Sequence, residues 1–477
     1  MPLSPSYKPD PAFAQLGQEF ADPVEPARFP KHVLRRRNQR WAERIGFGAL
    51  TETEWEACFA RFEPLPNNQP RPLAMRYHGH QFRAYNPDLG DGRGFLYAQL
   101  RDDAGRLLDF GTKGSGKTPY SRTADGRLTL KGGVREVLAA EMLEAQGVYT
   151  SKAFALYETG EALHRHDEPS PTRSSVLTRL SHSHIRIGTF QRLAFFEEAE
   201  NMHRLIEHVA TCYFPELSPL QREARPAALL RRACAELARL AASWMSAGFV
   251  HGVLNTDNLT LTGESFDYGP WRFLPTSDPN FTAAYFDETG LYSFGRQPEA
   301  VSWALAQLAG ALTLVSEVSP LEHALSEFGP AYQDALRKHV LQRLGLEPTN
   351  AKADLDFLQT VFAWMTETQV SWDQFFHDWF CGEASSRRAV TGPQAAAYAA
   401  AEFSEARAGI EARAPERPER LRHAYFQLAT PVSLVIDEVE RLWAPIADND
   451  DWSLFERKLA DIADMREALD IGAHRVS

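Results

Sequence analysis

Apolar residues in the second half of the chain recur at the spacing of an α-helix. Five of them, three or four positions apart, would share one buried helix face: Leu230, Ala233, Leu237, Leu240 and Trp244. Gly248 follows directly and predicts the end of this helix. The pattern indicates a core helix and not a cofactor-binding segment.

Other segments also have helical composition. Residues 134–143 are rich in helix formers and are followed by Gly147. Residues 302–315 form an apolar run, and residues 396–414 are rich in alanine and charge. We expect a buried helix in the first of these runs and an exposed one in the second. A further helical stretch is expected around residues 33–45.

Strand-like sequence concentrates between these helices and the N-terminal region. Residues 95–100 follow a glycine-rich turn, and a second turn at residues 101–105 leads into residues 107–113. This order predicts a glycine-rich turn, a strand, a hairpin and a second strand. Residues 174–179 predict a later strand of the same lobe.

The composition is that of a folded protein with an acidic surface. The 477 residues are 44% hydrophobic and 24% charged, and 51 basic against 63 acidic side chains give a net charge of −12. An acidic chain does not attract phosphate backbones over its whole surface, so we expect no nucleic-acid partner. Local basic runs such as residues 35–37 are interpreted as a solvated helix face.

The cysteines and the termini indicate the compartment. Four widely scattered cysteines form no Cys-x-x-Cys pair, which argues against a zinc site or a disulfide framework and favours a reducing cytoplasm. The first residues lack a basic segment followed by an apolar one, and no apolar run approaches the length of a membrane span. We therefore expect a cytoplasmic protein with no membrane partner.

Glycines and a lysine–glutamate pair indicate a phosphate-binding site in the first half of the chain. Gly90, Gly92 and Gly94 precede the first strand and would let the backbone approach phosphates. Lys113 ends the second strand, and Glu136 on the next helix could hold its ammonium group by an ion pair. This is the order found in the ATP-binding lobe of protein kinases.

The second half supplies matching metal ligands but lacks one catalytic group. Kinases place a His-x-Asp-x-x-x-x-Asn loop after a core helix and then an Asp-Phe-Gly motif. Here the loop runs from His251 to Asn258, and Asp267 follows within a short hairpin. Val253 replaces the first aspartate, and valine can neither accept a proton nor bind a metal. Asp257 is the nearest remaining carboxylate, either as a base or as part of an Asx turn.

These motifs predict an α+β protein with a two-lobed, protein-kinase-like fold. Residues 76–180 would form a β-rich N-lobe with its helix C, and residues 181–385 a helical C-lobe. Residues 1–75 would be an N-terminal extension and residues 386–477 a helical C-terminal region. Within the C-lobe, His251 is expected to be a buried hydrogen-bonding scaffold residue and not an acid or base.

A competing motif overlaps Lys113. Residues 111–118 satisfy the P-loop pattern Gly-x-x-x-x-Gly-Lys-Thr and follow a strand. A P-loop must open a helix, however, and residues 119–126 are turn-like. We therefore interpret Lys113, and not Lys117, as the phosphate-binding lysine.

At this point the chain resembles the SelO (YdiU) family of pseudokinases, which are protein adenylyltransferases. The ordered motifs that carry the resemblance are Tyr77-His78-Gly79-His80-Gln81-Phe82, Leu89-Gly90-Asp91-Gly92-Arg93, Thr118-Pro119-Tyr120-Ser121-Arg122, Asp125-Gly126-Arg127, Ser183-His184-Ile185-Arg186, His251 to Asn258, Asp267-Tyr268-Gly269-Pro270, Tyr292-Ser293-Phe294 and Gln297-Pro298. They extend over more than two hundred residues.

The resemblance implies that ATP binds in a flipped orientation and that AMP is transferred to Ser, Thr or Tyr hydroxyls of proteins. Arg179 and Arg186 would clamp phosphates. Asn258 and Asp267 would hold Mg²⁺ or Mn²⁺, and Asp257 would accept the proton. Carried over by motif, the nucleotide-binding residues are Gly90, Gly92, Arg93, Lys113, Glu136, Asp125, Gly126, Arg179, Arg186 and Asp267.

Two other functions remain open at this stage. One is a conventional ATP-dependent kinase in which Asp257 replaces the missing base. The other is a catalytically silent, nucleotide-binding scaffold. The family typically carries a selenocysteine or cysteine near its C-terminus, whereas residues 473–477 contain neither, so redox control by a terminal thiol is not expected. The stretch after Cys381 shows few of the family's motifs, so substrate docking by that region could differ.

Overall fold

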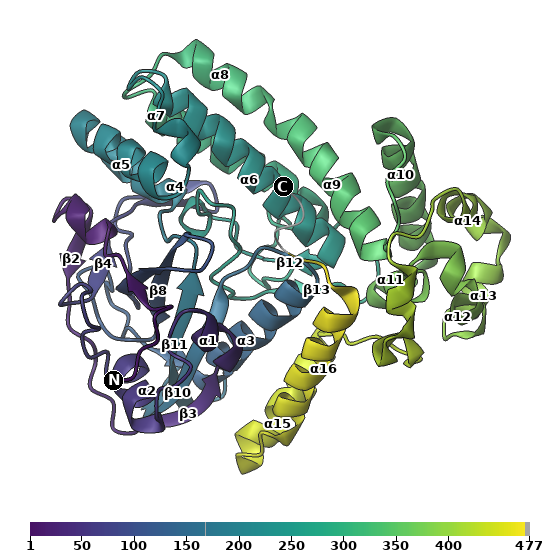
Figure 1. The fold of residues 1–477 in the computed structure, drawn as a ribbon, viewed down its shortest axis with the longest axis horizontal. Coiled ribbons are helices and arrows are strands. Elements are labelled where there is room, and N and C mark those ends of the chain that lie inside the picture. The colour runs from purple at the N-terminus through teal and green to yellow at the C-terminus, as the bar shows by residue number, and fades with distance from the viewer. Residues whose placement is uncertain (167, 473–477) are drawn as a thin grey trace.

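The computed structural model describes residues 1–166 and 168–472 and shows an α+β architecture (Figure 1). One curled antiparallel sheet occupies the N-terminal part, and helices make up most of the remainder. In the described residues the sheet has the order β2 (Ala21–Pro23), β4 (Leu73–Met75), β7 (Leu96–Arg101), β8 (Leu107–Lys113), β11 (Thr172–Ser181), β10 (Lys152–Leu163) and β3 (Val33–Arg37), with β1 (Lys8–Pro9) paired to β7 and β9 (Leu128–Thr129) to β11.

Helices surround this sheet and form the rest of the molecule. The α-helices of the described chain are α1 (Gln39–Arg44), α2 (Glu52–Phe59), α3 (Leu130–Ala145), α4 (Ile187–Phe195), α5 (Ala199–Cys212), α6 (Arg225–Ala247), α7 (Gln297–Leu312), α8 (Val318–Ser326), α9 (Phe328–Leu344), α10 (Ala351–Thr368), α11 (Trp372–Asp378), α12 (Ser386–Thr391), α13 (Ala395–Ala399), α14 (Ser404–Glu411), α15 (Ile436–Asn449) and α16 (Ser453–Leu469). No helix in the described ranges has both the length and the apolarity to cross a membrane.

The predicted hairpin of the first lobe is confirmed. β7 and β8 pair in antiparallel register, with Leu100 opposite Leu108 and Leu96 opposite Gly111. Every residue of β8 is buried, because β11 covers its other edge and core side chains cover both faces. The backbone at the end of such a strand is fixed, so the side chain of Lys113 extends from a rigid position.

Helix α3 packs against this sheet and begins at a defined residue. The Thr129 side chain accepts a hydrogen bond from the backbone N–H of Gly132, at 3.1 Å, and so caps the helix. Most α3 side chains are buried against β10 and β11. The sequence prediction of a helix at 134–143 is confirmed, and the helix extends about one turn further at its start.

The first 75 residues contribute strands to the same sheet as the predicted N-lobe. β1 pairs with β7, and β3 pairs with β10. The expectation of a helix over residues 33–45 is wrong for its first part. Residues 33–37 form β3, and Asn38, whose side chain accepts a hydrogen bond from Trp41 N–H at 3.2 Å, starts α1 only at Gln39. The domain boundaries themselves stay a prediction.

The helical part is built around α6, which packs against α7, α8 and α9. Its predicted apolar face is buried, and Gly248 ends it in the left-handed conformation with φ 65°. The apolar run expected at residues 302–315 lies in α7 as far as Leu312, where the helix ends. The expected exposed helix at residues 396–414 is instead interrupted: α13 ends at Ala399 and α14 begins at Ser404, with a short 3-10 turn between them.

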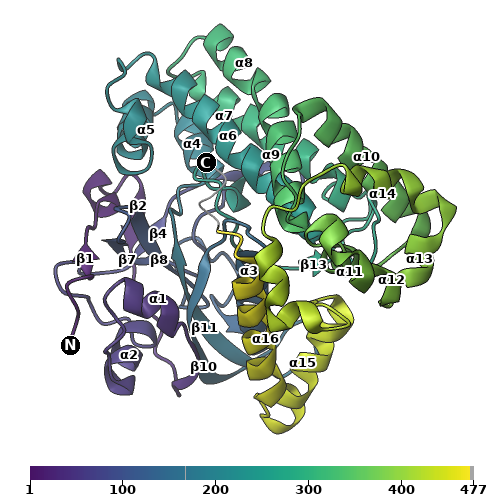
Figure 2. The ribbon, with the colours of Figure 1, turned by 45° about the vertical axis from the view of Figure 1, so that its right-hand side comes forward.

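The chain returns to the sheet at its C-terminal end. In both views α16 lies beside α3 (Figures 1 and 2). Arg466 of α16 forms ion pairs with Glu141 at 3.0 Å and Glu144 at 3.5 Å. Beyond α16, Ile471 packs on Gly147, where a Cβ atom would lie only 2.2 Å from its side chain. Residues 473–477, and with them the predicted absence of a terminal thiol, lie outside the described part of the chain.

A buried carboxyl group sits where the sheet meets the helical part. Ser265 N–H donates to the Tyr149 carbonyl at 2.8 Å, and Ser151 N–H donates to the Ser265 carbonyl at 2.9 Å. Glu264, directly before Ser265, accepts a hydrogen bond from His182 N–H at 2.7 Å. Burial raises the pKa of Glu264 from 4.5 to about 7, although Lys152 and Arg106 oppose the shift.

This pKa predicts a specific pH dependence of stability. Because the folded state binds the Glu264 proton more tightly than the unfolded state, its contribution is present below pH 4.5 and is lost as the pH rises through 7. Between pH 5 and 8 the loss is on the order of 2–3 kcal/mol. Between pH 5 and 8, the free energy of unfolding of Glu264→Gln should therefore fall by about 2–3 kcal/mol less than that of the wild type. Urea denaturation would measure this. The exposed Glu456→Gln should match the wild type, and identical pH slopes for all three proteins would contradict the assignment.

Candidate active site

An ion cluster, buried except at Asp267, whose side chain is 25% exposed, joins three of the predicted residues. The Lys113 ammonium nitrogen lies 2.5 Å from Glu136 Oε1 on α3 and 2.6 Å from Asp267 Oδ1. The lysine and glutamate side chains are only 5% and 2% exposed. The cluster thus links the last residue of β8, a helix and the loop after Phe266, and the predicted Lys113–Glu136 pair is present.

Asp267 has an unusual backbone and a strongly stabilised charge. Its φ of 62° lies in the left-handed region, which aspartate tolerates better than most residues. Burial alone would raise its pKa, but Lys113, Arg179 and Arg93 outweigh this and hold the pKa of Asp267 well below its usual range. The carboxylate is therefore ionised whenever the protein is folded at neutral pH.

Two buried arginines adjoin the cluster. Arg179 on β11 lies 3.2 Å from Asp267 Oδ1. Arg186, just before α4, lies 3.3 Å from Asp91 Oδ1 and donates to the His184 carbonyl at 3.2 Å. Both guanidinium groups lie over the ring of Phe266, at 5.5 and 5.3 Å. The stacking fixes the arginines while leaving part of their hydrogen-bonding capacity for a ligand.

The loop from His251 to Asn258 is held from two sides. His251 forms a hydrogen bond through Nε2 with the Phe266 carbonyl at 3.0 Å, and burial lowers its pKa, so it is neutral and serves as a scaffold. On the other side, the hairpin β5 (Gly79–Gln81) and β6 (Ala84–Asn86) donates two backbone hydrogen bonds to the loop. His80 N–H reaches Thr256 Oγ1 at 2.7 Å, and Phe82 N–H reaches Asn255 Oδ1 at 3.0 Å.

Asp257 is a partly buried residue of the 3-10 turn Thr256–Asn258, and its Oδ1 atom is buried. Its Oδ1 atom has no hydrogen-bond partner among the described residues. A Cβ at Gly79 would lie 3.1 Å from this atom, so a side chain there would crowd it. Burial raises the pKa of Asp257 to about 6, and Arg186 and Arg122 partly oppose the shift.

Asn258 is oriented by the same loop. Its Nδ2 group donates to the Val253 carbonyl at 3.0 Å, which leaves the amide oxygen available. An amide oxygen and the Asp267 carboxylate are the kind of hard oxygen donors that Mg²⁺ and Mn²⁺ prefer. Within the described ranges, no group of three or more His, Cys, Asp or Glu side chains is arranged to hold a metal.

The glycines of the turn before β7 lie close to other parts of the chain. A Cβ at Gly90 would lie 2.3 Å from the Tyr120 ring, and one at Gly92 would lie 2.9 Å from the Tyr120 carbonyl oxygen. At Gly94 it would lie 2.0 Å from the Thr112 carbonyl oxygen. Close packing of the chain against itself therefore already requires these glycines. Arg93 is close enough to Asp267 to lower its pKa.

Asp125 and Gly126 stand apart from the ion cluster. Asp125 pairs with Arg165 at 2.8 Å and accepts a hydrogen bond from Arg127 N–H at 2.9 Å. Gly126 has φ 71°, and a Cβ there would lie 2.2 Å from the Gly116 carbonyl oxygen. Among the described residues, no ion pair or hydrogen bond connects Asp125 to Lys113, so the structure does not bring these two predicted residues together.

The P-loop alternative is excluded. Residues 114–127 form turns, and the next helix, α3, begins only at Leu130. No helix N-terminus follows Lys117 directly, as a P-loop requires.

Sequence reasoning missed several residues that shape the site. Arg122, with φ 52°, is close enough to Asp257 to lower its pKa, and Asp91 pairs with Arg186. The centroid of the Tyr77 ring lies 4.3 Å from the Arg186 guanidinium carbon. All three fall inside the motifs quoted above, but nothing in the sequence distinguishes them from packing residues.

The shared lysine predicts a measurable coupling. Lys113→Met would leave two carboxylates without their common cation, and breaking a buried ion pair costs about 3–5 kcal/mol of unfolding free energy. Adding Glu136→Leu removes one unpaired charge, so the double variant should be less destabilised than the sum of the single variants by about 1–3 kcal/mol. Chemical denaturation would measure this, with the exposed Lys352→Met as control. Strict additivity would show that Lys113 and Glu136 do not interact.

The geometry can now be compared with known proteins. The profile of the family described as Protein adenylyltransferase SelO matches residues 4–463, including the stretch after Cys381 that the motifs did not connect with the family. A protein nucleotidyltransferase YdiU of Synechococcus elongatus is 43% identical over 94% of both chains. A protein of the same name from Synechocystis is 50% identical over 71% of both chains. Another, from Pseudomonas putida, is 37% identical over 77% of this chain and 74% of the relative.

The match covers nearly the whole chain, and it includes the ion cluster, the two arginines and the loop that carries Asp257. The chain therefore belongs to the SelO family of protein adenylyltransferases.

Proposed function

We propose that the protein transfers AMP from ATP to the hydroxyl groups of Ser, Thr or Tyr side chains in other proteins. The observation that carries this proposal is the buried, unpartnered Asp257 Oδ1 beside Asn258, in a loop where Val253 replaces the usual kinase aspartate. A carboxylate oxygen without a partner is available to accept the proton of an attacking hydroxyl.

The charges of the site support a flipped nucleotide. Arg179 and Arg186 are 5% and 4% exposed, so they are enclosed as deeply as Lys113 at 4%. The γ-phosphate carries the highest negative charge of ATP and would be stabilised best by these two guanidinium groups. Lys113 would then contact the middle of the triphosphate, and the α-phosphorus would face Asp257.

Asn258 and Asp267 would hold Mg²⁺ or Mn²⁺, with phosphate oxygens and water completing the coordination. When bound, the ion would neutralise charge on the phosphates. The residues themselves would do the remaining work: Lys113, Arg179 and Arg186 orient the triphosphate, and Arg93 adds positive charge near Asp267. For Asp125 and Gly126, the family resemblance is the support for a nucleotide contact.

The reaction follows from this placement. The acceptor hydroxyl oxygen forms a bond to the α-phosphorus while its proton moves to Asp257. The bond between the α-phosphorus and the bridging oxygen breaks, and pyrophosphate leaves with its charge stabilised by Arg179 and Arg186.

Labelled ATP tests the reaction. Label at the α-phosphate should appear on acceptor protein, and label at the γ-phosphate should not. Asp257→Asn should lower transfer by about 100-fold or more, since a positioned base contributes 10²–10⁴. The exposed Asp448→Asn is the matched control. Transfer of γ-label would establish the kinase alternative, and transfer of neither label would establish a nucleotide-binding scaffold.

Nucleotide affinities test the orientation. Arg179→Met should weaken ATP binding by roughly 10- to 100-fold, since hydrogen bonds to charged groups contribute about 1.5–3 kcal/mol. AMP lacks the γ-phosphate, so its affinity should change less than about twofold. Isothermal titration calorimetry on the folded variant, with the exposed Arg231→Met as control, would measure both. Equal losses for ATP and AMP would place the adenylate, and not the γ-phosphate, beside Arg179.

A further inference from the structure

A cavity lies beside the C-terminal end of α3, away from the predicted nucleotide-binding residues. Its volume is about 210 Å³, and it opens between α1, α3, the start of β10 and the end of α16. Lys113, Asp257 and Asp267 are not among its described lining residues. Its lining includes Arg40, Trp41, Arg44, Glu144, Lys152 and Arg466.

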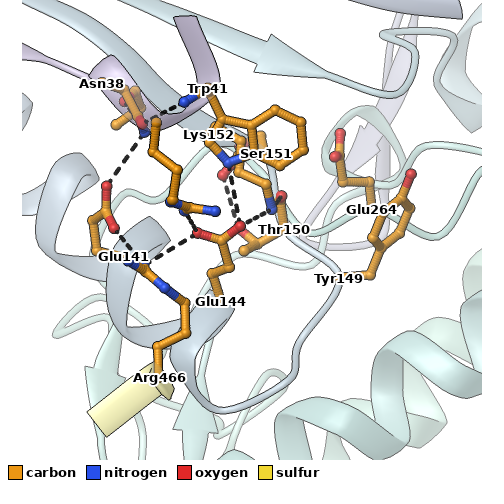
Figure 3. Close-up of polar contacts among 12 residues, drawn as sticks. Asn38, Trp41, Glu141, Glu144, Tyr149, Thr150, Ser151, Lys152, Glu264 and Arg466 are labelled. Carbon is orange, nitrogen blue, oxygen red and sulfur yellow. Dashed lines mark hydrogen bonds and ion pairs between the residues drawn. The ribbon is translucent and has the colours of Figure 1, made fainter. Parts of the chain in front are cut away.

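Cations outnumber carboxylates around this cavity. Five cations line it, against the three carboxylates Glu144, Glu264 and Asp470. Two of these cations, Arg44 and Arg106, also pair with carboxylates outside the lining, Asp103 and Asp102. Figure 3 shows Lys152 and Arg466 both directed at Glu144. Burial opposes ionisation of Glu144, but Lys152, Arg40 and Arg466 outweigh it and lower its pKa to about 2. Among the described lining residues, cations therefore exceed carboxylates by two.

The cations are held in place by an aromatic ring. The indole of Trp41, itself buried, has Arg44 at 4.4 Å, Lys152 at 5.4 Å and Arg40 at 5.7 Å from its centroid. Cations above an aromatic face are stabilised without using their hydrogen bonds. Lys152 also donates to the Thr150 carbonyl at 2.6 Å, which fixes its direction. The positive groups are therefore preorganised around one space.

Of the two other acidic residues in the wall, Asp470 pairs with Arg420, and Glu264 is only partly charged at neutral pH. Glu264 stands across from Lys152 in Figure 3 and has a pKa of about 7 because it is buried. A protonated carboxyl group adds a hydrogen-bond donor to the cavity and does not cancel the cations.

We propose that this cavity is a binding site for a small ligand carrying a phosphate group. Guanidinium and ammonium groups converging on one enclosed space match the several oxygens of a phosphate better than the two of a carboxylate. The volume accommodates the phosphate with a small attached group but not a second intact nucleotide. The site is separate from the nucleotide site and does not depend on the proposed reaction.

The position of the cavity gives such a ligand access to the active-site elements. Glu144 lies two turns along α3 from Glu136. Glu264 is three residues before Asp267, on the segment that hydrogen bonds to residues 149–151. A ligand held by Arg40, Lys152 and Arg466 would thus connect α1, β10 and α16 around the end of the helix that carries Glu136.

Phosphate binding tests the proposal directly. Equilibrium dialysis with labelled inorganic phosphate at constant ionic strength would compare the wild type with Arg40→Gln/Arg44→Gln. These arginines are 40% and 38% exposed, so the variant should fold, which its denaturation midpoint would verify. We expect the affinity of one class of phosphate site to be about tenfold or more lower in the variant.

The matched control is Arg407→Gln/Arg441→Gln, two exposed arginines that are each paired with one glutamate elsewhere. It should bind phosphate like the wild type. Phosphate bound at the nucleotide site is common to all three proteins, so only the cavity contributes to the difference. Identical isotherms for the wild type and the cavity variant would overturn the proposal. Crystals soaked with selenate should show an anomalous peak beside Lys152 and Arg44, and an empty cavity there would also overturn it.

Discussion

The ion cluster of Lys113, Glu136 and Asp267 is the interaction on which the site depends. Each residue comes from a different element, and each would be costly to bury alone. Their mutual neutralisation therefore fixes β8, α3 and the loop after Phe266 relative to one another. None of these elements can move relative to the others without breaking the ion pairs of the cluster. The site is therefore rigid before a nucleotide binds.

The same cluster explains why the neighbouring arginines matter. Asp267 already forms ion pairs with Lys113 and Arg179. A metal ion binding there would have to compete with these two cations unless they moved to phosphate oxygens. A triphosphate supplies those oxygens. On the proposed function, nucleotide and metal binding would therefore be linked by charge balance. Each would make the other more favourable, because the nucleotide would draw Lys113 and Arg179 away from the carboxylate.

The sequence predicted the parts of this arrangement that follow a local pattern. The β7–β8 hairpin, α3 and α6 could be predicted because alternation, helix periodicity and capping are local properties. The pairing of Lys113 with Glu136 could be predicted from their order. The strand at residues 33–37 could not, because its pairing with β10 is set by a partner more than a hundred residues away. Asp91 and Arg122 were missed for the same reason, since their roles depend on which charges the fold brings near them.

Helix α3 links the two polar regions of the molecule, and its two ends differ in what holds them. Glu136 is fixed from the active-site side by Lys113, whereas Glu141 and Glu144 are fixed by Arg36, Arg40, Lys152 and Arg466 from the other side. A rigid helix transmits a displacement of one end to the other. The C-terminal helix α16, which comes from the opposite end of the sequence, therefore contributes to the position of Glu136 through Arg466.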